Sequence, residues 1–148
     1  KLGFRTTAHA GEAAGAHSVR AAVEVLRAER IGHGTRAIED PSVVDLLARR
    51  MIPVECCPIS NVRTAVIGRI EEHPLAAFLE RGIVASVNTD DPAMFDTSME
   101  EELLALRMRL AFTREDVVRL LANGIDSTWA PVPRKLRLRA ALTAAADG

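Results

Sequence analysis

The sequence lacks an excess of charge of either sign. It has 19 basic and 20 acidic residues, and its formal net charge at pH 7 is −1. Proteins that bind nucleic acid or an anionic membrane surface usually carry a strongly basic patch. The balance therefore predicts no nucleic-acid partner and no membrane partner.

Long apolar runs are also lacking, as is a cysteine pair suited to a disulfide. No segment approaches the roughly 20 apolar residues that span a bilayer, and residues 1–5 do not resemble a signal peptide. The two cysteines, Cys56 and Cys57, are neighbours, and a bridge between neighbours is strained and rare. We therefore expect free, buried cysteines in a cytoplasmic protein.

The sequence does contain an alternation of short strand-like runs with amphipathic segments. Its 148 residues, of which 48% are hydrophobic, are enough for one domain with a core. We expect strands at 4–9, 30–34, 52–57 and 83–88, helices at 16–29, 41–50, 74–81, 98–110, 113–124 and 134–146, and a loop at 58–73. Four strand–helix repeats predict a parallel sheet with right-handed crossovers.

Individual residues predict where some helices begin, end and face the core. Asp40 is a suitable N-cap, and Thr113 with Asp116 has the pattern of a capping box. Gly124 is expected to end the helix that this box begins. Leu26 is expected on the buried face of the first helix.

Polar side chains follow the expected ends of the strands. They include His9, His33 and the run from Asn88 to Asp91. In a (β/α)8 barrel this edge is the catalytic face, and open parallel sheets bind ligands at the same edge. A full barrel typically needs about 250 residues, so four βα units correspond to half of one barrel.

Five of these positions carry groups suited to metal-assisted hydrolysis. His9 and Asp90 are suitable zinc ligands, and a bound zinc ion lowers the pKa of water to about 7. His33 can take a proton from that water or hold it in place. Glu12, if burial keeps it protonated, can donate a proton to a substrate. Asp91 can accept a hydrogen bond from the polar edge of a substrate.

Four motifs in fixed order carry a resemblance to a known family. They are segments 9–12 (His-Ala-Gly-Glu), 30–34 (Arg-Ile-Gly-His-Gly), 57–61 (Cys-Pro-Ile-Ser-Asn) and 88–92 (Asn-Thr-Asp-Asp-Pro). At these separations they resemble the C-terminal half of a purine deaminase of the adenosine deaminase family. The resemblance implies an α/β fold, namely half of a TIM-type (β/α)8 barrel like those of metallo-dependent hydrolases. Residues 1–148 would form a single partial domain without the N-terminal half of that barrel.

The resemblance also implies a role for each matching residue. His9 and Asp90 would be zinc ligands, and His33 would orient or deprotonate the water that zinc activates. Glu12 would donate a proton to the purine N1, which receives electrons when water attacks C6. On the substrate side, Gly11 would lie against the purine and Asp91 would hydrogen-bond its N7.

Two departures from the family pattern stand out. The family carries two further zinc ligands in a His-x-His pair, but the four histidines here are His9, His17, His33 and His73. The chain would therefore hold at most half of the ligands of one zinc ion. Asp96 stands where the family has glycine, and we expect it to perturb the loop after the fourth strand without removing a catalytic group.

The resemblance implies hydrolysis of the 6-amino group of adenosine, giving an inosine-type product and ammonia. Two alternatives remain open. The substrate could be another aminopurine, such as adenine or aminodeoxyfutalosine, although Gly32 favours a nucleoside because adenine-preferring relatives tend to have aspartate there. The chain could also be an inert half-barrel that needs its N-terminal half, or a second copy, to cover its open strand edges.

Other conspicuous residues have structural interpretations. His17 is expected to be a solvated helix residue, His73 a loop or cap residue, and Trp129 a packing residue. The basic run at 134–139 alternates with leucine, which predicts a solvated amphipathic helix rather than a nucleic-acid patch.

Overall fold

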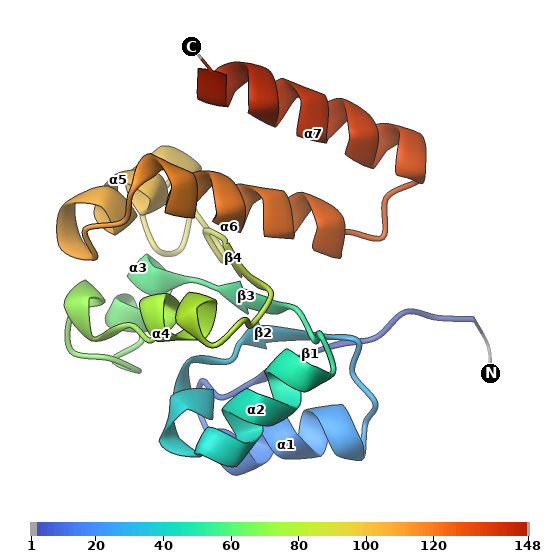
Figure 1. The fold of residues 1–148 in the computed structure, drawn as a ribbon. Helices are drawn as coiled ribbons and strands as arrows, with labels where there is room; N and C mark the ends of the chain where they lie inside the picture. The colour runs from blue at the N-terminus through green and yellow to red at the C-terminus, as the bar shows by residue number, and fades with distance from the viewer. Residues whose placement is uncertain (1–2, 148) are drawn as a thin grey trace.

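The computed structural model describes residues 3–147 and shows an α/β fold with one parallel sheet. The strands lie in the order β1 (Thr7–Ala10), β2 (Arg30–His33), β3 (Val54–Cys56) and β4 (Ala85–Val87). Consecutive strands pair in parallel, so that His9 lies opposite Gly32 and Gly32 lies opposite Glu55. The predicted βα repeats are confirmed, and Figure 1 shows the four strands in the middle of the fold.

The two faces of the sheet differ in polarity because side chains alternate along each strand. One face carries Ile31, Val54, Cys56 and Ala85, which are fully buried in the hydrophobic core. The opposite face carries polar groups such as Glu55, which is half-buried. The apolar face therefore holds the fold together, and the polar face is free for chemistry.

Helices cover the apolar face. They are α1 (Ala16–Glu24), α2 (Pro41–Arg49) and α4 (Leu75–Glu80), with the 3-10 turn η1 (Thr35–Glu39) before α2. Val19, Leu47 and Phe78 from these helices are fully buried in the same core. Burying a side chain of this size contributes about 1.5–3 kcal/mol, so these contacts fix each helix against the sheet.

Three helices follow the last strand: α5 (Met99–Arg109), α6 (Arg114–Ser127) and α7 (Val132–Asp147). Leu106 and Leu120 extend the core into α5 and α6. Helix α7 packs on the outside of α6 (Figure 1), where Arg139 forms an ion pair with Asp126. The basic run in α7 is mostly exposed, as expected for a solvated helix.

Several local predictions are confirmed. The carboxylate of Asp40 accepts a hydrogen bond from the Ser42 N–H at 2.9 Å and caps α2. Thr113 and Asp116 form the expected capping box at the start of α6. Both cysteines are free and buried.

The first helix is shorter than predicted. It ends at Glu24, because the backbone turns at Arg27 with a φ of 56° and the Ala28 N–H closes the end by donating to Ala22 O. Leu26 is consequently 67% exposed rather than buried, so that prediction is wrong. The turn is needed because the chain must reverse before β2 can pair beside β1.

Two further boundaries also differ from the prediction. Residues 58–73 contain a helix, α3 (Pro58–Arg63), and a 3-10 turn, η2 (Ile70–Glu72), rather than only a loop. Pro58 occupies the first turn of α3, a position that proline favours. Helix α6 continues through Gly124 to Ser127, and this glycine faces β4, where an added Cβ would lie 3.4 Å from the Cβ of Ser86. Gly124 therefore lies within the helix, on the side that packs against β4, instead of ending the helix.

Among residues 3–147, no helix combines the length and apolar character needed to cross a lipid bilayer.

Candidate active site

A cavity of about 300 Å³ lies at the carboxyl ends of the strands. Its lining includes His9, His33 and Asp90, together with Gly32 and Cys57. Three of the predicted site residues therefore share one space, although they come from β1, β2 and the segment after β4.

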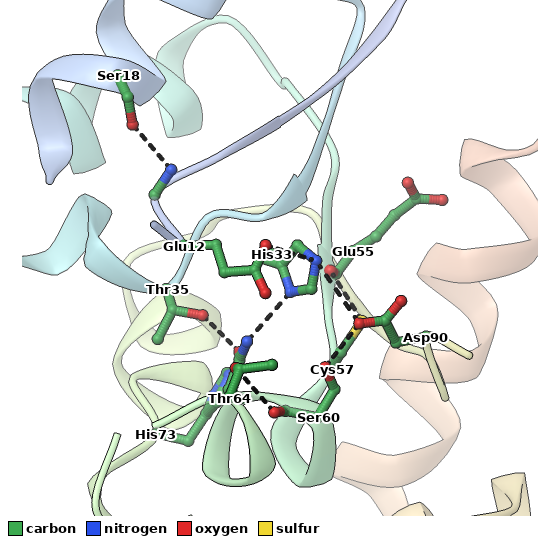
Figure 2. Close-up of polar contacts among 12 residues, drawn as sticks. Glu12, Ser18, His33, Thr35, Glu55, Cys57, Ser60, Thr64, His73 and Asp90 are labelled. Carbon is green, nitrogen blue, oxygen red and sulfur yellow. Dashed lines mark hydrogen bonds and ion pairs between the residues drawn. The ribbon is translucent and has the colours of Figure 1, made fainter. Parts of the chain in front are cut away.

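His33 is the central side chain of this site. Its Nε2 lies 3.4 Å from Oε2 of Glu12 and 3.8 Å from Oδ2 of Asp90. The rings of His33 and His9 meet edge to face, with centroids 4.8 Å apart. Figure 2 shows His33 between the carboxylates of Glu12 and Asp90. The structure thus brings together four of the predicted residues.

The backbone at two of these residues has an unusual conformation. His33 has a φ of 64° and Asp90 a φ of 59°. Met51 and Ala65 also have positive φ, but each immediately follows the C-cap of a helix, where this conformation is common. His33 and Asp90 instead lie at or just after strand ends. Such strain costs about 1–3 kcal/mol for each residue and is concentrated at functional sites.

The environment of His33 sets its charge. The side chain is only 2% exposed, and this burial lowers its pKa. The negative charge of Glu12 acts in the opposite direction without overcoming the burial. His33 is therefore a neutral imidazole at neutral pH.

The other ring nitrogen of His33 faces a group of buried polar residues. Its Nδ1 lies 3.1 Å from Nδ2 of Asn61, whose Oδ1 accepts a hydrogen bond from Thr35 Oγ1 at 2.6 Å. Oδ1 also lies 3.3 Å from Nε2 of His73. The expected capping role of His73 is confirmed by the Leu75 N–H, which donates to its Nδ1, but the ring is also buried.

Asp90 is held by a neighbour of Asn61. The hydroxyl of Ser60 donates a hydrogen bond to Oδ2 of Asp90 at 2.6 Å, and Ser60 is fully buried. The sequence did not predict that Ser60, Asn61, Thr35 or His73 supports the site. The motif at 57–61 was the signal that pointed to the first two of them.

The two residues expected to touch the substrate have other contacts in the structure. Gly11 is buried with a φ of 70°, and an added Cβ would lie 2.7 Å from Cγ2 of Val19, so glycine is required there by packing. Asp91 is exposed, and its Oδ1 accepts a hydrogen bond from the Met94 N–H at 2.8 Å. Their contacts with a purine stay predictions.

His9 and Asp90 line the same cavity and carry donor groups that suit a zinc ion. Ligand atoms of His9, Glu12 and His33 lie within 4.8 Å of one another, and so do those of His33, Cys57 and Asp90. Imidazole nitrogens and carboxylate oxygens are usual zinc ligands. Cys57 suits the metal less well, because burial raises the pKa of its thiol, whereas zinc binds the thiolate.

Residues outside the cavity mostly behave as expected. His17 is exposed on α1. Trp129 packs against Arg30, with the guanidinium 4.2 Å from the ring centroid. Asp96 has a φ of 44°, which explains why a glycine is expected there, because glycine adopts positive φ without strain.

Comparisons with known proteins agree with this geometry. A family model described as adenosine deaminase matches residues 1–145. An adenosine deaminase of Serratia proteamaculans is 42% identical over 137 residues, which are 93% of this chain and 41% of that protein.

Solved structures give the same result. The crystal structure of an adenine deaminase from Arthrobacter aurescens matches 99% of this chain and 45% of its own chain, with a TM-score of 0.95 and 37% identity. An amidohydrolase from Burkholderia ambifaria, solved with bound zinc, matches 98% of this chain and 41% of its own, with a TM-score of 0.86 and 30% identity. The predicted fold class, part of a TIM-type barrel, is thereby confirmed. The chain spans less than half the length of each of these relatives.

Proposed function

Because the chain belongs to the adenosine deaminase family, we propose that it forms half of the active site of a zinc-dependent aminopurine deaminase. The proposed reaction is hydrolysis of the 6-amino group of adenosine, giving an inosine-type product and ammonia. The observation that carries the proposal is the meeting of Glu12, His33 and Asp90 at one edge of the sheet. Three strand ends far apart in sequence place an acid, an imidazole and a carboxylate within reach of one small molecule.

Glu12 is the proposed proton donor. When water attacks C6 of the purine, electron density moves to N1, and a proton delivered there stabilises the transition state. The Glu12 side chain is 25% exposed, with Oε2 directed at His33. Glu12 can therefore contact a substrate in the cavity while His33 contacts its Oε2.

His33 and Asp90 are proposed to place the attacking water. His33 Nε2 and Asp90 Oδ2 are 3.8 Å apart, so one water oxygen can contact both groups. Asp90 can accept a hydrogen bond from this water and so direct a lone pair of the water oxygen toward C6. Ser60 holds the Asp90 carboxylate in place for this role by donating a hydrogen bond to its Oδ2.

A zinc ion is proposed to complete the site. His9 and Asp90 would hold it together with ligands from another segment, and as a Lewis acid it would make water reactive at neutral pH. The Gly32 position supports this role of His9, because its lack of a side chain leaves room for the His9 ring.

Adenine is the second candidate substrate. The observation in its favour is the TM-score of 0.95 to an adenine deaminase structure, whereas Gly32 favours a nucleoside. We propose adenosine first, with Gly11 against the purine and Asp91 hydrogen-bonded to N7. Aminodeoxyfutalosine belongs in the same comparison.

The partner of this chain is proposed to be the remaining half of the barrel, on the same polypeptide or on another. β1 and β4 are the outer strands of the sheet, so each offers an open edge for strand pairing. A second copy of the chain could cover the same edges. Size-exclusion chromatography of the isolated chain tests this, since a stable monomer would contradict the need for a partner.

The activity is tested by ammonia release from adenosine, adenine and aminodeoxyfutalosine, compared by kcat/KM in the intact protein. Bound zinc is counted in the same samples and in the isolated 148-residue chain. We expect the highest kcat/KM with adenosine. The isolated chain is expected to be inactive, and turnover by it would contradict the half-site proposal.

Glu12→Gln is the matched variant for the proton donor. The amide keeps the size and hydrogen-bonding reach of the side chain but has no acidic proton. We expect kcat to fall by about 10²–10⁴-fold, the usual contribution of a general acid, while zinc content is unchanged. Full turnover by Glu12→Gln would contradict the assignment.

A further inference from the structure

Behind His33, on the side away from the cavity, buried side chains form a continuous chain of hydrogen bonds. The chain runs from the backbone of Leu75 through His73 and Asn61 to His33 (Figure 2 labels His73 and His33). His73, Asn61 and His33 are each at most 3% exposed. A buried chain of this kind fixes the direction of each hydrogen bond once one end is known.

That end is the N–H of Leu75, which can only donate. It lies 3.1 Å from Nδ1 of His73, so Nδ1 must accept and carries no hydrogen. Burial lowers the pKa of His73 to about 3, so its ring is neutral at pH 7. A neutral ring without hydrogen on Nδ1 carries it on Nε2.

The next link fixes the amide of Asn61. Nε2–H of His73 points at this amide from 3.3 Å and needs an acceptor, so the oxygen Oδ1 must lie on that side. Thr35 donates to the same oxygen at 2.6 Å. The amide nitrogen is consequently turned toward His33, and Nδ2 lies 3.1 Å from Nδ1 of His33.

An amide nitrogen only donates, so Nδ1 of His33 must accept. We propose that His73 and Asn61 are positioning residues that hold His33 in the tautomer with its hydrogen on Nε2. His33 therefore enters the cavity as a hydrogen-bond donor. The Nε2–H faces the space beside Glu12 and Asp90, at 3.4 Å and 3.8 Å from their carboxylate oxygens.

The tautomer decides between the roles left open for His33. A ring nitrogen that carries a hydrogen has no lone pair for a metal or for a proton from water. His33 therefore orients the attacking water instead of deprotonating it, and it is not a zinc ligand although it belongs to both ligand groups. The statement that the Nε2–H of His33 acts on the attacking water rests on the proposed function, whereas the tautomer of His33 does not.

The first test reads the tautomer directly in the intact protein. Histidine labelled with ¹⁵N gives long-range ¹H–¹⁵N spectra in which the bare ring nitrogen resonates far downfield of the protonated one. Signals are assigned by the loss of single histidines in variants. We expect a protonated Nε2 and a bare Nδ1 for both His33 and His73. A protonated Nδ1 on His33 in the wild-type protein would overturn the proposal.

Two replacements of His73 separate positioning from packing. His73→Asn keeps an acceptor near the place of Nδ1 for Leu75 and loses the donor to Asn61. His73→Gln keeps a donor near the place of Nε2 and loses the acceptor. We expect His73→Asn to give mixed His33 tautomers. Its kcat should be about 10-fold lower with unchanged KM, as for other residues that orient a functional side chain through a hydrogen bond. His73→Gln should keep the His33 spectrum and kcat.

Equal behaviour of the two variants would mean that His73 acts only through packing, which overturns the proposal. Asn61→Asp gives a second test that does not depend on His73. The carboxylate still accepts from Thr35 and His73, which keeps it ionised, but it offers His33 an acceptor in place of a donor. We expect Nδ1 of His33 to become protonated, and an unchanged His33 spectrum would overturn the proposal. Circular dichroism confirms that each variant is folded.

The activity assay tests the proposed function, and the ¹⁵N spectra test the tautomer independently of it. If the intact wild-type protein releases no ammonia from any aminopurine, the proposed function is wrong, and the ¹⁵N spectra still decide whether His73 and Asn61 set the tautomer.

Discussion

Replacing Gly32 by alanine should disturb His9 while leaving the fold intact. An added Cβ at position 32 would lie 2.6 Å from Cδ2 and 3.0 Å from Nε2 of the His9 ring. Position 32 does not have a positive φ, so alanine fits the backbone there. The substitution therefore acts through one contact, with a residue proposed to bind zinc.

The size of the effect follows from that contact. Carbon atoms pack comfortably at about 3.5 Å, so the His9 ring must move by about 0.9 Å. His9 is exposed, and its ring can move without disrupting the core. Because only the ring of an exposed histidine has to move, we expect a stability change within about 0.5 kcal/mol. Misplacement of a functional group by about 1 Å costs about 10²-fold in rate, so kcat/KM should fall by about that factor.

The assay combines zinc affinity, turnover and stability in the intact protein. Zinc affinity is measured by competition with a chelator, and we expect at least about a 10-fold loss. Thermal unfolding of the zinc-free protein gives the stability. Gly124→Ala is the matched control, because its nearest contact is Ser86 Cβ at an ordinary 3.4 Å and alanine favours the interior of α6.

One result would refute the reasoning. If Gly32→Ala binds zinc and turns over substrate like the wild type, the position of the His9 ring is unimportant to the metal. The assignment of His9 as a zinc ligand would then be wrong. Equal losses in Gly32→Ala and Gly124→Ala would instead point to a general effect of adding a methyl group at either glycine.

Three other substitutions test neighbouring features. Asp96→Gly should raise the unfolding free energy by up to about 1 kcal/mol, because glycine relieves the positive φ; urea unfolding measures this, and a loss would contradict it. Ser60→Ala should lower kcat/KM by about 10-fold, because Asp90 loses the hydrogen bond that orients it; an unchanged kcat/KM would contradict that role. Burial raises the pKa of Glu102 to about 7, so its protonated form favours the folded state, and this stability is lost as pH rises from 4.5 through 7. Glu102→Gln should abolish that loss, which is on the order of 3 kcal/mol, as urea unfolding at pH 5 and pH 8.5 would show; equal pH dependence would contradict the raised pKa.

The fold could be predicted because its signals are local. Each strand is short and is followed by a helix that buries one face, so the order of elements follows largely from the helical periodicity and the residues that begin and end the helices. The boundaries were less accurate where tertiary packing prevails over local preference. Gly124 is a typical helix-ending residue, but here it lies inside α6, on the side that packs against β4.

The site was predictable only where residues lie near strand ends. His9, Glu12, His33 and Asp90 were identified from their types and positions, and the structure places them together. The residues behind them were not assigned roles, because their partners are distant in sequence. His73 follows a 3-10 turn and sits in front of α4, and no local pattern indicates that its ring reaches Asn61.

The short helix α3 contacts two of the proposed site residues, His33 and Asp90. Ser60 and Asn61 are neighbours in α3, and they hold Asp90 and His33 respectively. Each held residue has a positive φ, a conformation that persists only where surrounding contacts outweigh its cost. Since adjacent residues of one helix supply those contacts, α3 couples the positions of His33 and Asp90. Glu102 holds the start of the same helix by accepting from the Ile59 N–H at 3.4 Å, so movement of α3 would displace both site residues together.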